Sequence, residues 1–164
     1  MSETAQIAFV LNNQAVRCSV PVRCHLVDFL RLDMGLTGPH LGCEHGVCGA
    51  CHVRVDGVVL RGCLMLAVQA DGARIETIEG LSLTGEIADL QDAFVRRNAL
   101  QCGFCTSGML LTACELLARD MPLDRNTIRD ALSGNLCRCT GYQPIVDAIE
   151  EVSRARALQR DGKR

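Results

Sequence analysis

The chain has 164 residues and a formal net charge of −2, which fits one domain or two small ones. A near-neutral chain without a long basic stretch argues against a nucleic-acid partner. No apolar run is long enough for a membrane span, and residues 1–6 lack the features of a secretory signal. We therefore expect a cytoplasmic protein, unless the chain is exported as a passenger on a partner.

The N-terminal part, residues 1–78, is predicted to be a small α+β domain. Segments that alternate apolar and polar residues, and are therefore predicted strands, are 7–11, 15–20, 51–56, 58–60 and 74–78. Residues 12–14 form a turn between the first two, and residues 25–32 have the spacing of a short amphipathic helix. The predicted fold is a sheet with one helix and a cysteine loop at one rim.

Residues 79–86 carry turn residues without a clear period, and we interpret them as a linker. Beyond them the apolar residues follow a helical period over residues 87–164. The predicted helices are 87–98, 107–120, 126–132 and 145–157. Four short helices are typical of a small bundle.

Eleven cysteines in a chain expected to stay in the reducing cytosol indicate metal binding and not disulfides. A first set has the spacing C-x4-C-x2-C-x11-C and comprises Cys43, Cys48, Cys51 and Cys63. The first three match the plant-type ferredoxin spacing for a [2Fe–2S] cluster. Gly46 and Gly49 lie between these cysteines, where the backbone must approach the sulfurs closely.

A second set combines a C-x2-C pair, Cys102 and Cys105, with a C-x-C pair, Cys137 and Cys139. Structural zinc also takes four cysteines, but beside a ferredoxin-type set a second iron–sulfur site is the better interpretation. Each pair precedes a predicted helix N-terminus, which favours an anionic metal–thiolate centre of either kind. The remaining cysteines are interpreted as small buried apolar residues: Cys18, Cys24 and Cys114.

Three motifs, at 42–51, 100–105 and 134–142, make the chain resemble the small iron–sulfur subunit of the molybdenum hydroxylases. This family includes xanthine dehydrogenase and aerobic carbon monoxide dehydrogenase. The resemblance covers roughly residues 6–157. It implies an N-terminal β-grasp plant-type ferredoxin domain, then a C-terminal four-helix-bundle domain, each with one [2Fe–2S] cluster.

The resemblance also implies a role and partners. Substrate is hydroxylated at a molybdenum–pterin cofactor on a large subunit, and electrons pass first to the helical-domain cluster. The ferredoxin-type cluster then delivers them to FAD on a medium subunit, within a heterotrimer or its dimer. Gln101 and Cys139 occupy the positions that family members place against the pterin, so Cys139 is expected both to ligate iron and to touch the molybdenum cofactor.

Two positions depart from the family pattern. Many relatives have threonine where His52 follows Cys51, and proline where Ser107 stands. For His52 two interpretations are open: it tunes the first cluster through hydrogen bonding, charge or docking, or it is an exposed strand residue without a role. Replacing the proline removes only some pre-organisation of the helix start.

Two other classes of protein share part of this cysteine pattern. A free-standing two-cluster ferredoxin would carry the same ligands, but the 48% apolar composition favours surface that is buried in a complex. A zinc-stapled interaction module accounts poorly for the C-x4-C-x2-C spacing. No nucleotide-binding or nucleophile motif is present, so we expect no substrate site in this chain.

Overall fold

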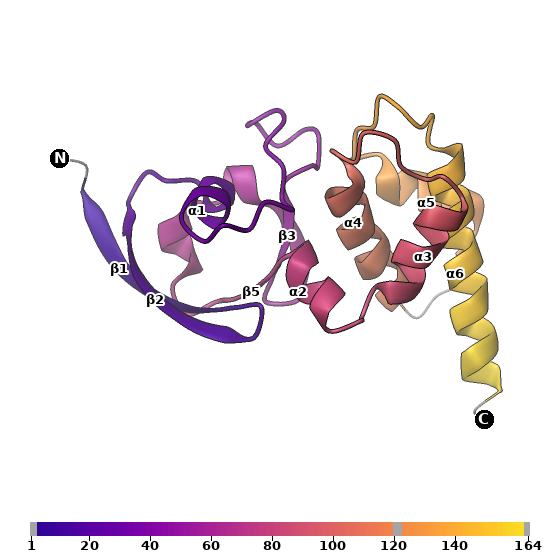
Figure 1. Ribbon diagram of the computed structural model, residues 1–164, viewed down its shortest axis with the longest axis horizontal. Helices are drawn as coiled ribbons and strands as arrows, with labels where there is room; N and C mark the ends of the chain where they lie inside the picture. The colour runs from indigo at the N-terminus through magenta and orange to yellow at the C-terminus, as the bar shows by residue number, and fades with distance from the viewer. Residues whose placement is uncertain (1–2, 120–122, 163–164) are drawn as a thin grey trace.

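The computed structural model describes residues 3–119 and 123–162, which form a five-stranded sheet at one end and a group of helices at the other (Figure 1). The strands are β1 (Thr4–Leu11), β2 (Gln14–Pro21), β3 (His52–Val55), β4 (Val58–Arg61) and β5 (Arg74–Glu76). Their order is β2-β1-β5-β3-β4, with β1 and β5 parallel and the other pairs antiparallel. The predicted α+β class is confirmed.

The helices, in chain order, are α1 (Leu26–Leu32), α2 (Ile78–Leu83), α3 (Ala88–Arg96), α4 (Thr106–Ala118), α5 (Arg125–Leu132) and α6 (Gln143–Asp161). Short 3₁₀ turns span Gly62–Leu64 and Ala67–Ala70. None of the helices in the described ranges is long and apolar enough to cross a membrane.

The four predicted C-terminal helices are confirmed as α3 to α6, with shifted ends. Asp120, the predicted end of the second, lies outside the described residues. Helix α6 continues to Asp161, four residues beyond the prediction. Arg156, in the last turn of the predicted range, pairs with Asp89 of α3 at 2.7 Å.

Two apolar cores hold the two ends of the molecule. In the first, α1 packs across the sheet, and the ring of Phe29 meets that of Phe9 on β1 edge-on at 6.0 Å between centroids. The second core joins α3, α4, α5 and α6 through aliphatic residues, with Phe94 as its only fully buried aromatic side chain among the described residues. Burial of these faces is the main driving force for each half.

Helix α2 differs from the prediction, because residues 79–86 carry no helical period yet include most of this helix. Tertiary contacts support it instead. Leu81 is buried in the helical core, and the Glu79 carboxylate accepts the Gly38 N–H at 2.7 Å. The Asn12 side chain accepts the Thr77 N–H at 2.9 Å and donates to the Thr77 hydroxyl at 3.0 Å, just before α2 begins.

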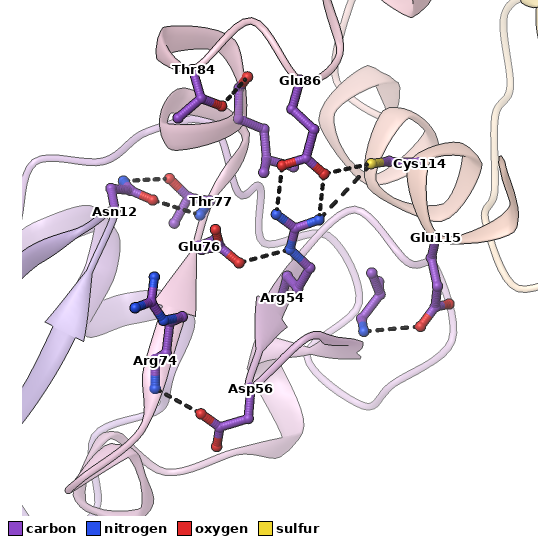
Figure 2. A network of polar contacts seen from close by, with 12 residues as sticks. Asn12, Arg54, Asp56, Arg74, Glu76, Thr77, Thr84, Glu86, Cys114 and Glu115 are labelled. Carbon is purple, nitrogen blue, oxygen red and sulfur yellow. Dashed lines mark hydrogen bonds and ion pairs between the residues drawn. The ribbon is translucent and has the colours of Figure 1, made fainter. Parts of the chain in front are cut away.

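A polar network ties the sheet to the helices, as Figure 2 shows. Arg54 on β3 donates to Glu76 at 2.8 Å and to both carboxylate oxygens of Glu86 at 2.6 and 2.9 Å. The Cys114 thiol on α4 donates to the same Glu86 carboxylate at 3.3 Å. Because charge-assisted bidentate pairs are directional, this network fixes α4 relative to β3.

Two candidate metal centres

The first cysteine set comes together at one rim of the sheet. Cys43 and Cys48 lie in the loop after α1, Cys51 lies directly before β3, and Cys63 lies in the 3₁₀ turn after β4. Cys51 and Cys63 are each 2% exposed and lie within hydrogen-bonding reach of each other, and Cys43 and Cys48 are also in mutual contact. The backbone N–H of Cys48 donates to Cys43 Sγ at 3.3 Å.

The first set contains two kinds of thiol. Backbone hydrogen bonds, that from Cys48 foremost, lower the pKa of Cys43 to about 6 and so favour its thiolate. Burial above all, with a contribution from the Cys63 thiol, raises the pKa of Cys51 to about 12. A buried thiol of this kind becomes a thiolate when a cation compensates its charge, as a metal centre does.

The loop around the first set requires glycine at its closest contacts. A Cβ added at Gly42 would lie 3.2 Å from Cys48 Sγ, and one at Gly46 would lie 2.5 Å from the Leu64 side chain. Gly46 also has a φ of +79°, which disfavours other residues. At Gly42 the backbone therefore passes close to Cys48 Sγ, as a loop that encloses a small metal–sulfur group would. We call residues 42–51 the first cysteine loop.

The second cysteine set sits at the N-termini of two helices, as predicted. Cys105 is the N-cap of α4, and the C-x-C pair precedes the N-cap of α6. The Cys139 thiol donates to Cys102 Sγ at 3.6 Å, while the thiols of Cys105 and Cys137 hydrogen-bond to each other. Two contacting pairs therefore bring all four predicted ligands to one end of the helical group.

The second set, like the first, contains one thiol with a lowered pKa and one buried thiol with a raised pKa. Burial acts to raise the pKa of Cys137, but hydrogen bonds from the hydroxyl and N–H of Thr140 outweigh it and leave that pKa lowered. These two donors lie 3.1 and 3.4 Å from Cys137 Sγ. Burial also raises the pKa of Cys105 to about 12, and there no hydrogen bond reverses it. Each set thus combines a stabilised thiolate with a buried thiol that needs a cation.

No three His, Cys, Asp or Glu side chains in the described parts of the chain form a group that would hold a single metal ion. The assignment of metal to these thiols therefore rests on the contacts within pairs and on the chemistry of the donors. Four thiols at each site are the donor set of a [2Fe–2S] centre.

Gln101 and Cys139, predicted to face a partner's pterin, are adjacent. The Gln101 side-chain amide donates to the Cys139 carbonyl at 3.0 Å, and both residues are exposed. Cys102 is exposed as well, so the second centre reaches the surface at this point. The contact of these residues with a pterin stays a prediction.

The two centres approach each other through the backbone. The Leu136 N–H, adjacent to Cys137, donates to the carbonyl of Cys48 at 2.8 Å. Leu136 belongs to the segment that carries the C-x-C pair, which we call the second cysteine loop (residues 134–142). One hydrogen bond therefore connects a predicted ligand of the first centre to the neighbour of a predicted ligand of the second.

The structure adds a supporting residue that the sequence reasoning missed. Tyr142, the only tyrosine of the chain, accepts the Cys137 N–H at 2.8 Å and donates its hydroxyl proton to the Asn135 carbonyl at 3.0 Å. Its φ of +66° is left-handed, and the two hydrogen bonds place its hydroxyl against the earlier residues of the second cysteine loop. A lone tyrosine three residues after a predicted ligand pair was the available signal.

Two expectations need correction. His52 is a strand residue, the first of β3, but it is not exposed: it is 7% exposed, and its Nδ1 lies 3.0 Å from the Thr112 hydroxyl on α4. Burial, and then the charge of Arg61, lower its pKa. Of the three remaining cysteines, Cys114 is buried as expected, whereas Cys18 and Cys24 are partly exposed, because they lie on β2 and in the turn after it, at an edge of the sheet.

Two protein-family models match the chain and show the class of protein. Residues 9–78 match the family model described as a 2Fe-2S iron-sulfur cluster binding domain, and residues 77–150 match the [2Fe-2S] binding domain. The chain is therefore a two-domain iron–sulfur protein.

Two relatives and one solved structure show which family of iron–sulfur proteins the chain is similar to. The chain is 51% identical over 150 residues to caffeine dehydrogenase subunit gamma of Pseudomonas sp. (strain CBB1), with 90% of each chain covered. It is 41% identical over 150 residues to the xanthine dehydrogenase iron-sulfur-binding subunit of Escherichia coli O157:H7, covering 90% and 94%. Quinoline 2-oxidoreductase from Pseudomonas putida 86 has a chain that superposes with a TM-score of 0.89 at 50% identity, covering 97% of this chain and 98% of that one.

The chain accordingly belongs to the small iron–sulfur subunits of the xanthine dehydrogenase family of molybdenum hydroxylases. It is the iron–sulfur component of an oxidoreductase.

Proposed function

We propose that this chain carries electrons from a molybdenum–pterin site on a large subunit, through two [2Fe–2S] clusters, to FAD on a medium subunit. In this proposal residues 1–78 form a β-grasp ferredoxin-type domain, residues 79–86 a connection, and residues 87–164 a four-helix domain. When bound, each cluster supplies a one-electron carrier. The chain itself supplies thiolates, hydrogen bonds and a fixed spacing between the sites.

The ligand assignment follows the two groups of thiols. The first cluster would be held by Cys43, Cys48, Cys51 and Cys63, and the second by Cys102, Cys105, Cys137 and Cys139. Gln101 and Cys139, exposed and hydrogen-bonded to each other, would face the pterin of the large subunit.

The observation that carries the proposal is the hydrogen bond from Leu136 N–H to the Cys48 carbonyl, 2.8 Å long. It places the two cysteine loops in direct contact, while the second site opens to solvent at Cys102 and Cys139. Two adjacent centres with one open to the surface are suited to carry electrons from one partner to another.

Exposed apolar side chains beside both sites favour a bound component over a freely diffusing ferredoxin. Val47 and Leu64 at the first site are 49% and 64% exposed, and Phe104 and Leu136 at the second are 44% and 52% exposed. Apolar surface concentrated in this way is typical of a region that a partner covers.

Metal analysis of the complex purified through a tag on this chain tests the proposal. We expect about four irons and four acid-labile sulfides per chain, and two distinguishable paramagnetic signals on reduction. Cys63→Ala should remove one signal and Cys137→Ala the other, whereas Cys24→Ala, outside both sets, should retain both. A zinc-loaded, colourless protein would refute the proposal. Recovery of the iron-loaded chain without larger subunits would favour the diffusing ferredoxin.

A further inference from the structure

We propose that His52, Thr112 and Asn135 form a polar clamp that positions the two cysteine loops relative to each other, and so sets the separation of the centres. The inference rests on the proposed function, because separation matters only if both centres carry electrons. Each end of the clamp adjoins a predicted ligand: His52 follows Cys51, and Asn135 lies two residues before Cys137.

The three side chains are buried and in mutual contact. His52, Thr112 and Asn135 are 7%, 9% and 2% exposed. Thr112 donates its hydroxyl proton to Asn135 Oδ1 at 2.9 Å, and the same hydroxyl oxygen lies 3.0 Å from His52 Nδ1. Because the Thr112 hydroxyl donates to Asn135, it accepts from His52 only when Nδ1 carries the proton. The amide nitrogen of Asn135, 3.4 Å from that Nδ1, is then a packing neighbour and not a third hydrogen bond.

The clamp joins three segments that are distant in the sequence. His52 begins β3, Thr112 lies in the middle of α4, and Asn135 lies in the second cysteine loop. A hydroxyl has one proton and two lone pairs, so Thr112 can donate to one neighbour and accept from the other. Thr112 is therefore the central member, through which α4 holds both ends of the clamp.

Glycines allow the backbones around the clamp to approach closely. A Cβ at Gly49, in the first cysteine loop, would lie 2.5 Å from the Gly134 carbonyl oxygen and 2.8 Å from the Asn135 side-chain nitrogen. A Cβ at Gly108 on α4 would lie 2.1 Å from the Gly49 carbonyl oxygen. Because so little space is left, a small rearrangement of the clamp must move one cysteine loop relative to the other.

The three residues act through the loops and not on an electron carrier directly, so they are positioning residues. Thr112 gives the cleanest test because it is not adjacent to any predicted ligand. Thr112→Val removes the hydroxyl while keeping the shape of the side chain, and Thr112→Ser keeps the hydroxyl. This pair separates the hydrogen bonds from the packing.

The experiment uses the purified complex. Hydrogen exchange at the Leu136 amide, which donates to the Cys48 carbonyl, should be about tenfold faster in Thr112→Val than in wild type. In the fully reduced complex we expect mutual magnetic coupling to broaden both paramagnetic signals, and Thr112→Val should change this coupling without loss of iron. Thr112→Ser should restore wild-type values in both measurements.

A second variant keeps the test decisive if Thr112→Val does not fold. His52→Thr introduces the residue expected at this position in many relatives and removes the imidazole, and it should alter exchange and coupling in the same direction. Iron-loaded variants with wild-type exchange and coupling would overturn the clamp, as would uncoupled signals in wild type. A wild-type complex without two iron–sulfur signals would instead refute the proposed function.

Discussion

Replacing Gly108 by alanine tests how closely the two halves of the molecule are packed. Gly108 lies in the first turns of α4 and faces the first cysteine loop. An added Cβ would stand 2.1 Å from the Gly49 carbonyl oxygen and 3.1 Å from its carbonyl carbon. The closer of these separations is far inside van der Waals contact, so α4 and the loop would have to move apart by roughly 1 Å.

Two opposing effects set the magnitude for Gly108→Ala. Within a helix, alanine is favoured over glycine by about 0.8–1 kcal/mol. Overpacking costs about 1–3 kcal/mol, and losing the nearby hydrogen bond between Leu136 and Cys48 costs about 1 kcal/mol more. We therefore expect a net decrease of about 1–3 kcal/mol in the free energy of unfolding, although helix propensity alone predicts an increase.

The assay is guanidinium unfolding followed by helical circular dichroism and by visible absorbance. Gly162→Ala is the matched control, because Gly162 has an ordinary φ of −72° and its added Cβ would meet the Leu158 carbonyl at 3.5 Å, a normal contact. That control should change the unfolding free energy by no more than about 0.5 kcal/mol. A Gly108→Ala protein as stable as wild type would show that the two halves are less closely packed than the structure indicates.

Three further outcomes are expected. Tyr142→Phe should lower the unfolding free energy by about 1–3 kcal/mol in chemical denaturation, because the Cys137 N–H and the Asn135 carbonyl lose their partner; unchanged stability would contradict this. Glu86→Gln should lower the unfolding free energy by about 1 kcal/mol near neutral pH. The pKa of the Glu86 carboxyl is lowered in the folded protein, chiefly by the hydrogen bonds from Arg54. The stabilisation by the Glu86 carboxylate is therefore present above the unfolded pKa of about 4.3 and is lost as pH falls through the lower folded pKa. The unfolding free energies of wild type and Glu86→Gln should converge in acid. A difference between them that stays constant with pH would exclude this linkage. Removing iron with a chelator under reducing conditions should lower the unfolding midpoint, and equal midpoints with and without iron would show that the fold does not depend on the metal.

Local pattern was sufficient for most elements. Alternating apolar and polar residues predicted the strands, and the helical period predicted α3 to α6. The apolar residues on the buried face of a strand recur every two residues, and those of a helix every three to four. Helix α2 has no such period. It depends on contacts of Glu79 with Gly38 and of Leu81 with the helical core, which lie far away in the sequence or in another element.

The same division applies to the sites. Cysteine spacing predicted both ligand sets, since ligands of one centre must reach it from short loops of defined length. Spacing could not reveal that Tyr142 is hydrogen-bonded to the backbone of the second cysteine loop, or that His52 is buried. Both depend on which surfaces meet once the two halves have packed.

The amino-acid sequence by itself determined the two groups of thiols and the elements that carry them, because these follow from residue type and local spacing. Only the tertiary structure decided how the groups are placed relative to each other. That placement arises where Gly49 and Gly108 let distant backbones approach to within a few ångströms, and where Gly134 leaves room for the Arg61 side chain. Contacts at this range depend on the absence of side chains at several remote positions at once, and no local pattern encodes such a coincidence.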